Sequence, residues 1–187
     1  MASQTRAFRV YNMPSEKERL ELKTGKTPLK LVLKLKSTIR DLYGVDPDKY
    51  IPLNTRLTCI DSFCIIHSEI PSTRGLRLSN LRIIYEGSWL GVYVKRTALP
   101  SISLARRILQ EHGLRSAILV SDQGVKAFLY GNDILPQSVI KIYPSSTGIY
   151  TVIDSSDQEV IGFSKWSSRR KVYVNIYDLG IFLRILG

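Results

Sequence analysis

The sequence contains few of the residues from which metal centres and redox sites are built. Its 187 residues include two cysteines and two histidines. Cys59 and Cys64 stand five positions apart, and neither has a further Cys or His at a zinc-binding spacing. We therefore expect small buried thiols in a reducing compartment, ordinary imidazoles at His67 and His112, no metal site and no cofactor.

Long apolar runs are also missing. No stretch reaches the roughly 18 apolar residues that a membrane-spanning helix needs. The opening residues, MASQTRAFRV, lack the apolar segment of a signal peptide. These two features predict a soluble intracellular protein with no membrane partner.

The motifs of several common enzyme classes are absent as well. The chain has no G-x-S-x-G, no G-x-x-x-x-G-K-[ST], no G-x-G-x-x-G after a strand and no H-E-x-x-H. Four aspartates would form a paired-carboxylate site only if they converged in space, and a turn explains each of them better. They are Asp122, Asp133, Asp154 and Asp157. We therefore predict no catalytic residue and no small-molecule substrate.

Acidic residues are scarce relative to basic ones. The 27 Lys and Arg against 16 Asp and Glu give a net charge of +11. Such a balance favours binding to polyanions, of which nucleic acid is the commonest. Residues 1–40 hold most of the excess, with ten basic and three acidic side chains, whereas residues 116–187 are nearly neutral apart from the segment KWSSRRK.

The first part of the chain predicts helices beside an antiparallel sheet. Capping residues and helical periodicity predict helices over residues 15–23 and 28–43 and between Ser101 and Gly113. Thr27 suits the N-cap of the second helix, and Gly44 suits its end. Branched and aromatic runs predict strands at residues 6–13, 62–67, 81–86 and 89–95.

From residue 117 the pattern changes to short strands. We place the domain boundary at residues 113–116, between a domain of residues 1–113 and a domain of residues 117–187. Strands are predicted at residues 117–120, 126–130, 139–143, 149–154, 159–166 and 171–177. The runs on either side of the polar SSDQ segment predict a hairpin, and Asp178 suits the cap of a final helix.

One dense cluster of cations stands out in the second domain. Lys165, Arg169, Arg170 and Lys171 lie on the link between the last two predicted strands, with Trp166 beside them. Cations that bind phosphates and an aromatic ring that stacks on a base are the groups that nucleic-acid sites use. A solvated basic turn, with Trp166 anchoring the core, is the alternative.

Three segments follow one another in the second domain: F-L-Y-G-N at residues 128–132, G-F-S at residues 162–164 and D-L-G-I-F-L-R at residues 178–184. In this order they resemble segments of PUA domains, the small RNA-binding modules of pseudouridine synthases and archaeosine transglycosylases. The set is most similar to the Nip-seven family of large-subunit ribosome biogenesis factors. The resemblance implies an α+β protein: an N-terminal α/β domain with an antiparallel sheet flanked by helices, followed by a small PUA-type β-barrel domain.

The resemblance also implies a function. It indicates a non-catalytic RNA-binding protein of large-subunit biogenesis, with ribosomal or precursor RNA and other assembly factors as partners. Such a protein is cytoplasmic in an archaeon and nucleolar in a eukaryote. The implied RNA-binding residues are Lys165, Arg169, Arg170, Lys171, Tyr177, Gly131 and Asn132.

The roles of these residues differ. The four cations are expected to contact phosphates. Val174 and Tyr177 stand where relatives extend the basic stripe, but neither is cationic, so Tyr177 is expected to stack on a base rather than to contact a phosphate. Gly131 is expected to adopt a backbone conformation that a side chain obstructs, beside an RNA groove, and Asn132 or Asp133 to cap a short helix that follows.

Two alternative functions are compatible with the same sequence. The first is a PUA-containing RNA-modification enzyme or accessory subunit, with a catalytic site in residues 1–113. The second is a protein-protein adaptor whose basic N-terminal domain binds an acidic protein surface.

Overall fold

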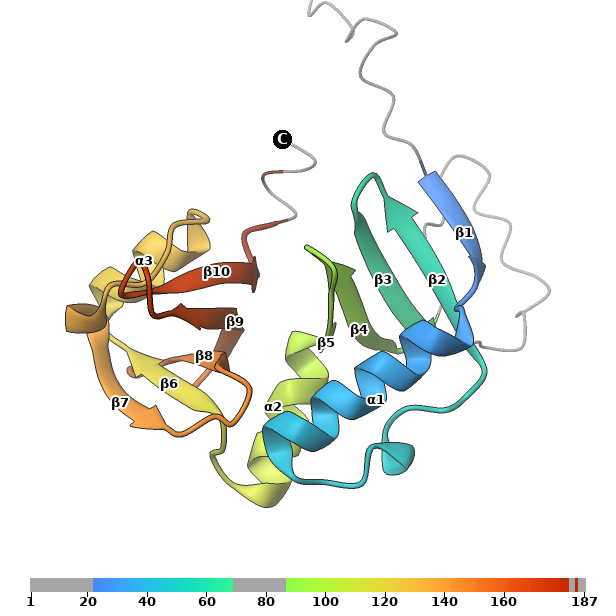
Figure 1. Ribbon diagram of the computed structural model, residues 1–187, viewed down its shortest axis with the longest axis horizontal. Helices are drawn as coiled ribbons and strands as arrows, with labels where there is room; N and C mark the ends of the chain where they lie inside the picture. The colour runs from blue at the N-terminus through green and yellow to red at the C-terminus, as the bar shows by residue number, and fades with distance from the viewer. Residues whose placement is uncertain (1–21, 69–86, 182–183, 185–187) are drawn as a thin grey trace, which may run out of the picture.

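Two five-stranded sheets lie side by side, with helices packed against them (Figure 1). The computed structural model describes residues 22–68, 87–181 and 184. The strands predicted at residues 6–13 and 81–86 and most of the helix predicted at residues 15–23 lie outside this range. No helix in the described part of the chain is long and apolar enough to cross a bilayer. The mixture of helices and sheets confirms the α+β class.

The first sheet is antiparallel throughout, as predicted. Its strand order follows the sequence and comprises β1 (Leu22–Lys26), β2 (Thr55–Ile60), β3 (Phe63–Ser68), β4 (Trp89–Val94) and β5 (Thr97–Pro100). Leu22 and Lys23 were assigned to a helix from the sequence, and this was wrong, because Leu22 to Lys26 pair in register with Ile60 to Arg56 of β2. The strands β2 and β5 were not predicted from the sequence.

Two helices pack against the first sheet near the places predicted for them. They are α1 (Leu29–Tyr43) and α2 (Ile102–His112). Gly44 ends α1 in a left-handed conformation, and the Ser101 hydroxyl caps α2 by accepting a hydrogen bond from the Leu104 amide. The Thr27 cap was wrong, since Pro28 occupies the N-cap position and no described side chain caps this end of α1.

The two cysteines are bonded to each other rather than free. Cys59 of β2 and Cys64 of β3 form a disulfide across the hairpin. The two residues face each other directly in the strand register, which places both side chains on the same face of the sheet. The prediction of free buried thiols was therefore wrong.

The second sheet has the order β10-β9-β8-β6-β7. Its strands are β6 (Ala117–Val120), β7 (Val139–Tyr143), β8 (Ile149–Asp154), β9 (Val160–Ser167) and β10 (Val172–Asp178). All five agree with predicted strands, and β8 and β9 form the predicted hairpin. The pairing of β6 with β8 is parallel, and the other pairings are antiparallel.

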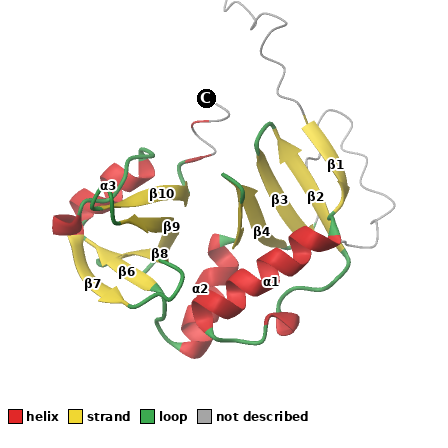
Figure 2. Cartoon of the chain, in the orientation of Figure 1, coloured by secondary structure: helices red, strands yellow, loops and turns green. Residues whose placement is uncertain are grey.

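The strand predicted at residues 126–130 is a helix. Figure 2 shows α3 (Asp122–Leu129) beside the second sheet. Phe128 and Tyr130 alternate as they would in a strand, but Gly124, Val125 and Phe128 form the buried side of a helix. The Ser121 hydroxyl accepts a hydrogen bond from the Gly124 amide at its start. Most of the final helix predicted after Asp178 lies outside the described residues.

One hydrophobic core joins the two sheets. It contains residues of α1, α2 and the first sheet together with Ala117, Ile153, Val160, Phe163 and others of the second sheet. The Tyr43 hydroxyl of α1 is 2.8 Å from the Thr151 hydroxyl of β8, and burial raises the pKa of Tyr43. Because the core is continuous across residues 113–116, the domain boundary placed there stays a prediction.

Candidate nucleic-acid interface

The turn after α3 holds two of the predicted site residues. The Asn132 amide donates to the Ala127 carbonyl and the Gly131 amide donates to the Phe128 carbonyl, which is the Schellman pattern of a helix end. Gly131 has a φ of +88°, and a Cβ atom there would lie 3.1 Å from the Arg184 guanidinium carbon. The prediction that a side chain would obstruct this position is confirmed.

Asp133 does not cap a helix. The next helical turn, η3 (Pro136–Ser138), begins at Leu135 without a side-chain cap from the described residues, so the capping role predicted for Asn132 or Asp133 was wrong. The Asp133 carboxylate instead accepts a hydrogen bond from the backbone N–H of Asn175 at 2.9 Å and forms an ion pair with Arg170 at 2.6 Å. This ion pair joins the turn after α3 to the basic cluster.

The basic cluster lies at the β9–β10 hairpin, with Lys165 on β9 and Arg169, Arg170 and Lys171 on the turn that follows it. Lys165, Arg169, Arg170 and Lys171 are all exposed. Lys171 has a φ of +56°, and its amide donates to the Ser167 carbonyl at 2.8 Å, which closes a tight turn that displays Arg169 and Arg170. We call these four residues and the turn the basic hairpin.

Trp166 of β9 packs against Tyr173 of β10 at the base of the basic hairpin. Its ring centroid lies 4.8 Å from that of Tyr173, and Tyr173 contacts Tyr150 edge to face at 5.4 Å. Burial, and secondarily the neighbouring Tyr150, raise the pKa of the Tyr173 hydroxyl. The alternative of a core-anchored Trp166 therefore describes this residue better than an open stacking platform does.

Tyr177 is not on the surface. Its side chain is 0% exposed, and its ring lies between the two sheets, 5.8 Å from Phe63, 6.4 Å from Phe163 and 6.4 Å from Trp89. A buried ring cannot stack on a base, so the predicted role of Tyr177 in RNA binding was wrong. Tyr177 is a central contact between the two sheets.

The three segments that resemble PUA motifs converge in space. Asn175 donates from its side-chain amide to the Phe128 carbonyl and to the Asp178 carboxylate, each at 2.9 Å. Arg184 donates to the Leu129 carbonyl at 2.7 Å and to the Asp178 carboxylate at 2.6 Å. These bonds fix the end of α3 against the end of β10.

Gly162 of the second segment lies at the same place. A Cβ atom on Gly162 would be 2.2 Å from the Tyr177 carbonyl oxygen and 2.8 Å from a ring carbon of Phe128. Only glycine allows the backbones of β9 and β10 and the Phe128 ring to approach this closely. Each motif is weakly specific in the sequence, but together they form one structural unit.

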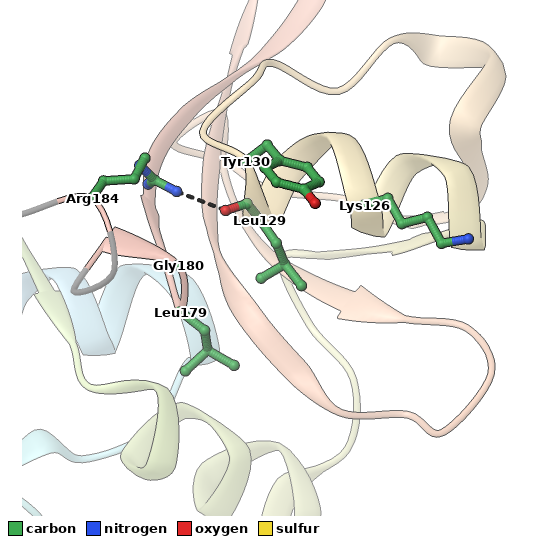
Figure 3. A pocket seen from close by; sticks show the side chains of 6 residues that line it. All are labelled: Lys126, Leu129, Tyr130, Leu179, Gly180 and Arg184. Carbon is green, nitrogen blue, oxygen red and sulfur yellow. Dashed lines mark hydrogen bonds between the residues drawn. The ribbon is translucent and has the colours of Figure 1, made fainter. Parts of the chain in front are cut away.

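A pocket of about 560 Å³ opens beside this unit (Figure 3). It is lined by Lys126, Leu129, Tyr130, Leu179, Gly180 and Arg184. Figure 3 shows the side chains from α3 and its turn on one side and those that follow β10 on the other, with the bond from Arg184 to the Leu129 carbonyl closing one end. The Tyr130 side chain is 80% exposed, so its ring is accessible to a ligand.

The pocket offers the chemistry that a nucleotide needs. Leu129 and Leu179 give apolar surface for a planar ring, Tyr130 gives an exposed aromatic face, and Lys126 gives positive charge, whereas the charge of Arg184 is balanced by Asp178. Arg184 also lies against Gly131, so the pocket and the turn adjoin. No group of three or more potential metal ligands is present among the described residues.

Sequence reasoning missed the pocket residues Lys126, Tyr130 and Arg184. The signal was present in the F-L-Y-G-N segment. Had this segment been assigned to a helix ending at Gly131, Phe128 and Tyr130 would have been placed on different sides, with Phe128 inward. The strand assignment placed both rings on the same face of a sheet, so it did not indicate that Tyr130 is exposed.

Comparison with known proteins agrees with this geometry. The family model described as the UPF0113 PUA domain matches residues 116–187. Comparison with curated protein sequences finds no match.

Solved structures share the fold over both sheets. A hypothetical protein from the archaeon Pyrococcus horikoshii superposes with a TM-score of 0.57 at 10% identity, covering 84% of this chain and 93% of that one. A conserved PUA domain protein from Thermoplasma acidophilum gives 0.53 at 12% identity, covering 84% and 95%. A PUA domain from Aeropyrum pernix, solved as a tartrate complex, gives 0.53 at 16% identity, covering 89% and 91%.

PUA domains are generally RNA-binding modules, and in this chain the family match, the fold and the three converging motifs coincide in one segment. Residues 116–187 of this protein form a PUA domain.

Proposed function

We propose that this protein binds structured RNA through its PUA domain. The basic hairpin contacts backbone phosphates, and the pocket beside Tyr130 receives an unpaired base. The observation that carries this proposal is the Arg170–Asp133 ion pair, which places the basic hairpin directly against the turn that borders the pocket. Phosphate contacts and a base-sized pocket thus adjoin on a PUA domain.

The two parts of this surface suit different features of RNA. Side chains cannot read the deep major groove of an A-form helix, so proteins recognise duplex RNA mainly through its backbone and shape. Unpaired bases in loops, bulges and ends are bound by stacking and by hydrogen bonds to their edges. A helix that ends in an unpaired nucleotide fits both parts at once.

Within this proposal, the RNA is ribosomal or precursor ribosomal RNA and the process is large-subunit assembly. The support is the resemblance of the three PUA segments to those of the Nip-seven family. In this proposal the protein is non-catalytic, because its sequence lacks the enzyme motifs named above. Co-sedimentation of the protein with large-subunit precursors, and loss of that association in a variant without the basic hairpin charges, tests this part.

Removing the charges of the basic hairpin is expected to weaken RNA binding without unfolding the protein. A triple Arg169→Ala, Arg170→Ala, Lys171→Ala variant should bind structured ribosomal RNA roughly tenfold or more weakly at physiological salt. The slope of log affinity against log salt should fall by about 0.9 for each lost phosphate contact. Fluorescence anisotropy across a salt series measures both quantities.

The control variant removes three exposed cations elsewhere. Arg40, Lys49 and Lys141 are exposed and lie outside the proposed surface, so their replacement by alanine changes the net charge equally. Melting temperatures of both variants should stay near that of the wild type, because exposed ion pairs contribute little stability. Equal affinities of the two variants would overturn the proposed site, and failure of the wild-type protein to bind RNA would overturn the proposed function.

Tyr130 provides a separate test of the pocket. Because its ring is exposed, Tyr130→Ala should leave stability unchanged and weaken binding to RNA with an unpaired nucleotide by about 1–3 kcal/mol, the contribution of one base stack. Tyr130→Phe keeps the aromatic face and should retain most of the affinity. A fully paired RNA should bind Tyr130→Ala and wild type equally, and a similar loss on both RNAs would argue against base stacking.

A further inference from the structure

The tip of the β4–β5 hairpin in the first sheet has two basic residues in unfavourable backbone conformations. Val94 pairs with Thr97, so the turn consists of Lys95 and Arg96 alone. Their φ angles are +46° and +62°. A two-residue turn of this type strongly favours Asn and Gly, and a left-handed conformation costs an ordinary residue about 1–2 kcal/mol. Strain of this kind often marks a functional position.

A third cation supports the tip. Lys34 of α1 donates to the Arg96 carbonyl at 2.5 Å, and its ammonium lies 5.8 Å from the centre of the Tyr93 ring. No carboxylate among the described residues forms an ion pair with Lys34, Lys95 or Arg96. We call these three residues the hairpin-tip cluster.

The hairpin-tip cluster is fixed against the PUA domain. Lys95 donates to the Asn175 carbonyl of β10 at 2.7 Å. The backbone N–H of Asn175 donates to the Asp133 carboxylate, which pairs with Arg170. The N–H and C=O groups of one strand residue point to the same side of the strand. Lys95 and the Arg170–Asp133 pair therefore meet the same edge of β10.

From this geometry we propose that the hairpin-tip cluster binds the phosphate backbone of the same RNA that the PUA domain binds. The inference rests on the proposed function and extends the RNA surface across both sheets. Lys95 anchors the tip to β10, and Arg96 is the cation left to contact a phosphate. Its side chain is exposed and has no partner in the described part of the chain.

The two sheets hold this surface in fixed geometry. The shared core, with Tyr177 at its centre, and the bond from Lys95 to Asn175 join the first sheet to the edge of β10 that carries Asp133. A preformed surface avoids the entropy that two independently moving domains would lose on binding one RNA. The first sheet, through the hairpin-tip cluster, thus contributes directly to RNA affinity.

Arg96→Gly tests this inference sharply, because it should separate stability from binding. Glycine is the residue that the second position of this turn favours, so the melting temperature should stay equal or rise. The bond from Lys95 to Asn175 remains. RNA affinity at physiological salt should fall about three- to tenfold, and the salt slope should decrease by about 0.9, as expected for one lost phosphate contact.

Lys141→Ala is the matched control. Lys141 is exposed on β7, the edge of the second sheet opposite β10, and its loss changes the net charge equally. It should leave affinity within about twofold of wild type by long-range electrostatics alone. Arg96→Glu should weaken binding more than Arg96→Gly.

The outcomes separate this inference from the proposed function. If the basic hairpin variant loses affinity while Arg96→Gly and Lys141→Ala bind alike, the RNA surface is confined to the PUA domain and the inference is wrong. If neither the basic hairpin variant nor Arg96→Gly differs from its control, the proposed RNA site itself is wrong.

Discussion

Tyr177→Ala is expected to lower the free energy of unfolding by about 3–5 kcal/mol, the usual cost of truncating a fully buried aromatic ring. The ring contacts Phe63 and Trp89 of the first sheet and Phe163 of the second, so its loss opens a cavity between the sheets. Urea denaturation followed by intrinsic fluorescence measures the change. The loss should be much larger than that of any variant of the basic hairpin.

Tyr177→Phe is the control that separates packing from RNA binding. It retains the ring and its three aromatic neighbours, so most of the stability should remain. RNA affinity should equal that of the wild type, because the buried ring is not accessible to a base. A marked loss of affinity in a stable, folded Tyr177→Phe protein would contradict the buried role and restore the stacking role that the sequence predicted.

Asp178→Ala is expected to destabilise the protein by about 3 kcal/mol. The Asp178 side chain is 0% exposed and accepts hydrogen bonds from the Gly180 amide, the Asn175 side-chain amide and the Arg184 guanidinium. Each donor left buried without an acceptor costs about 1–3 kcal/mol, although Arg184 is partly exposed and regains water. Thermal and urea denaturation measure the loss of stability.

The effect of Asp178→Ala on RNA binding follows from the same bonds. Arg184 lines the pocket and is oriented by Asp178 and the Leu129 carbonyl, so the variant should also bind RNA with an unpaired nucleotide more weakly. Asp178→Asn keeps the shape and one acceptor oxygen and should lose less stability. Equal stability of Asp178→Ala and wild type would show that the network does not hold α3 against β10.

Local sequence patterns were sufficient to predict the elements that depend mainly on backbone conformational preferences. Gly44 and Gly113 follow the last residues of α1 and α2, and Ser101 caps the start of α2, because helix ends need an acceptor at one end and a left-handed or flexible residue at the other. The five strands of the second sheet were found from their branched and aromatic runs. The α3 segment was assigned wrongly because Phe128 and Tyr130 alternate as in a strand, whereas in the helix only Phe128 lies on the side that β6 and β10 cover.

The candidate site was predictable only in part. Arg169, Arg170 and Lys171 were identified because a polar turn between two strands must be exposed. Tyr177 was assigned to the RNA surface and Tyr130 was given no role there, since no local pattern tells which of two aromatic rings a distant sheet will cover. Phe63, more than a hundred positions away, is one of the residues that buries Tyr177.

From the sequence alone it was possible to derive the α+β class, the end of α1 at Gly44, both ends of α2, the strands of the PUA domain and the exposure of the basic hairpin, because these features depend on backbone preferences and short-range periodicity. The folded arrangement was needed to establish the burial of Tyr177, the pairing of Cys59 with Cys64 and the convergence of Asp133, Arg170 and Lys95 at the edge of β10. These features depend on which surfaces meet after the chain folds, and burial between sheets is a property of two distant segments together.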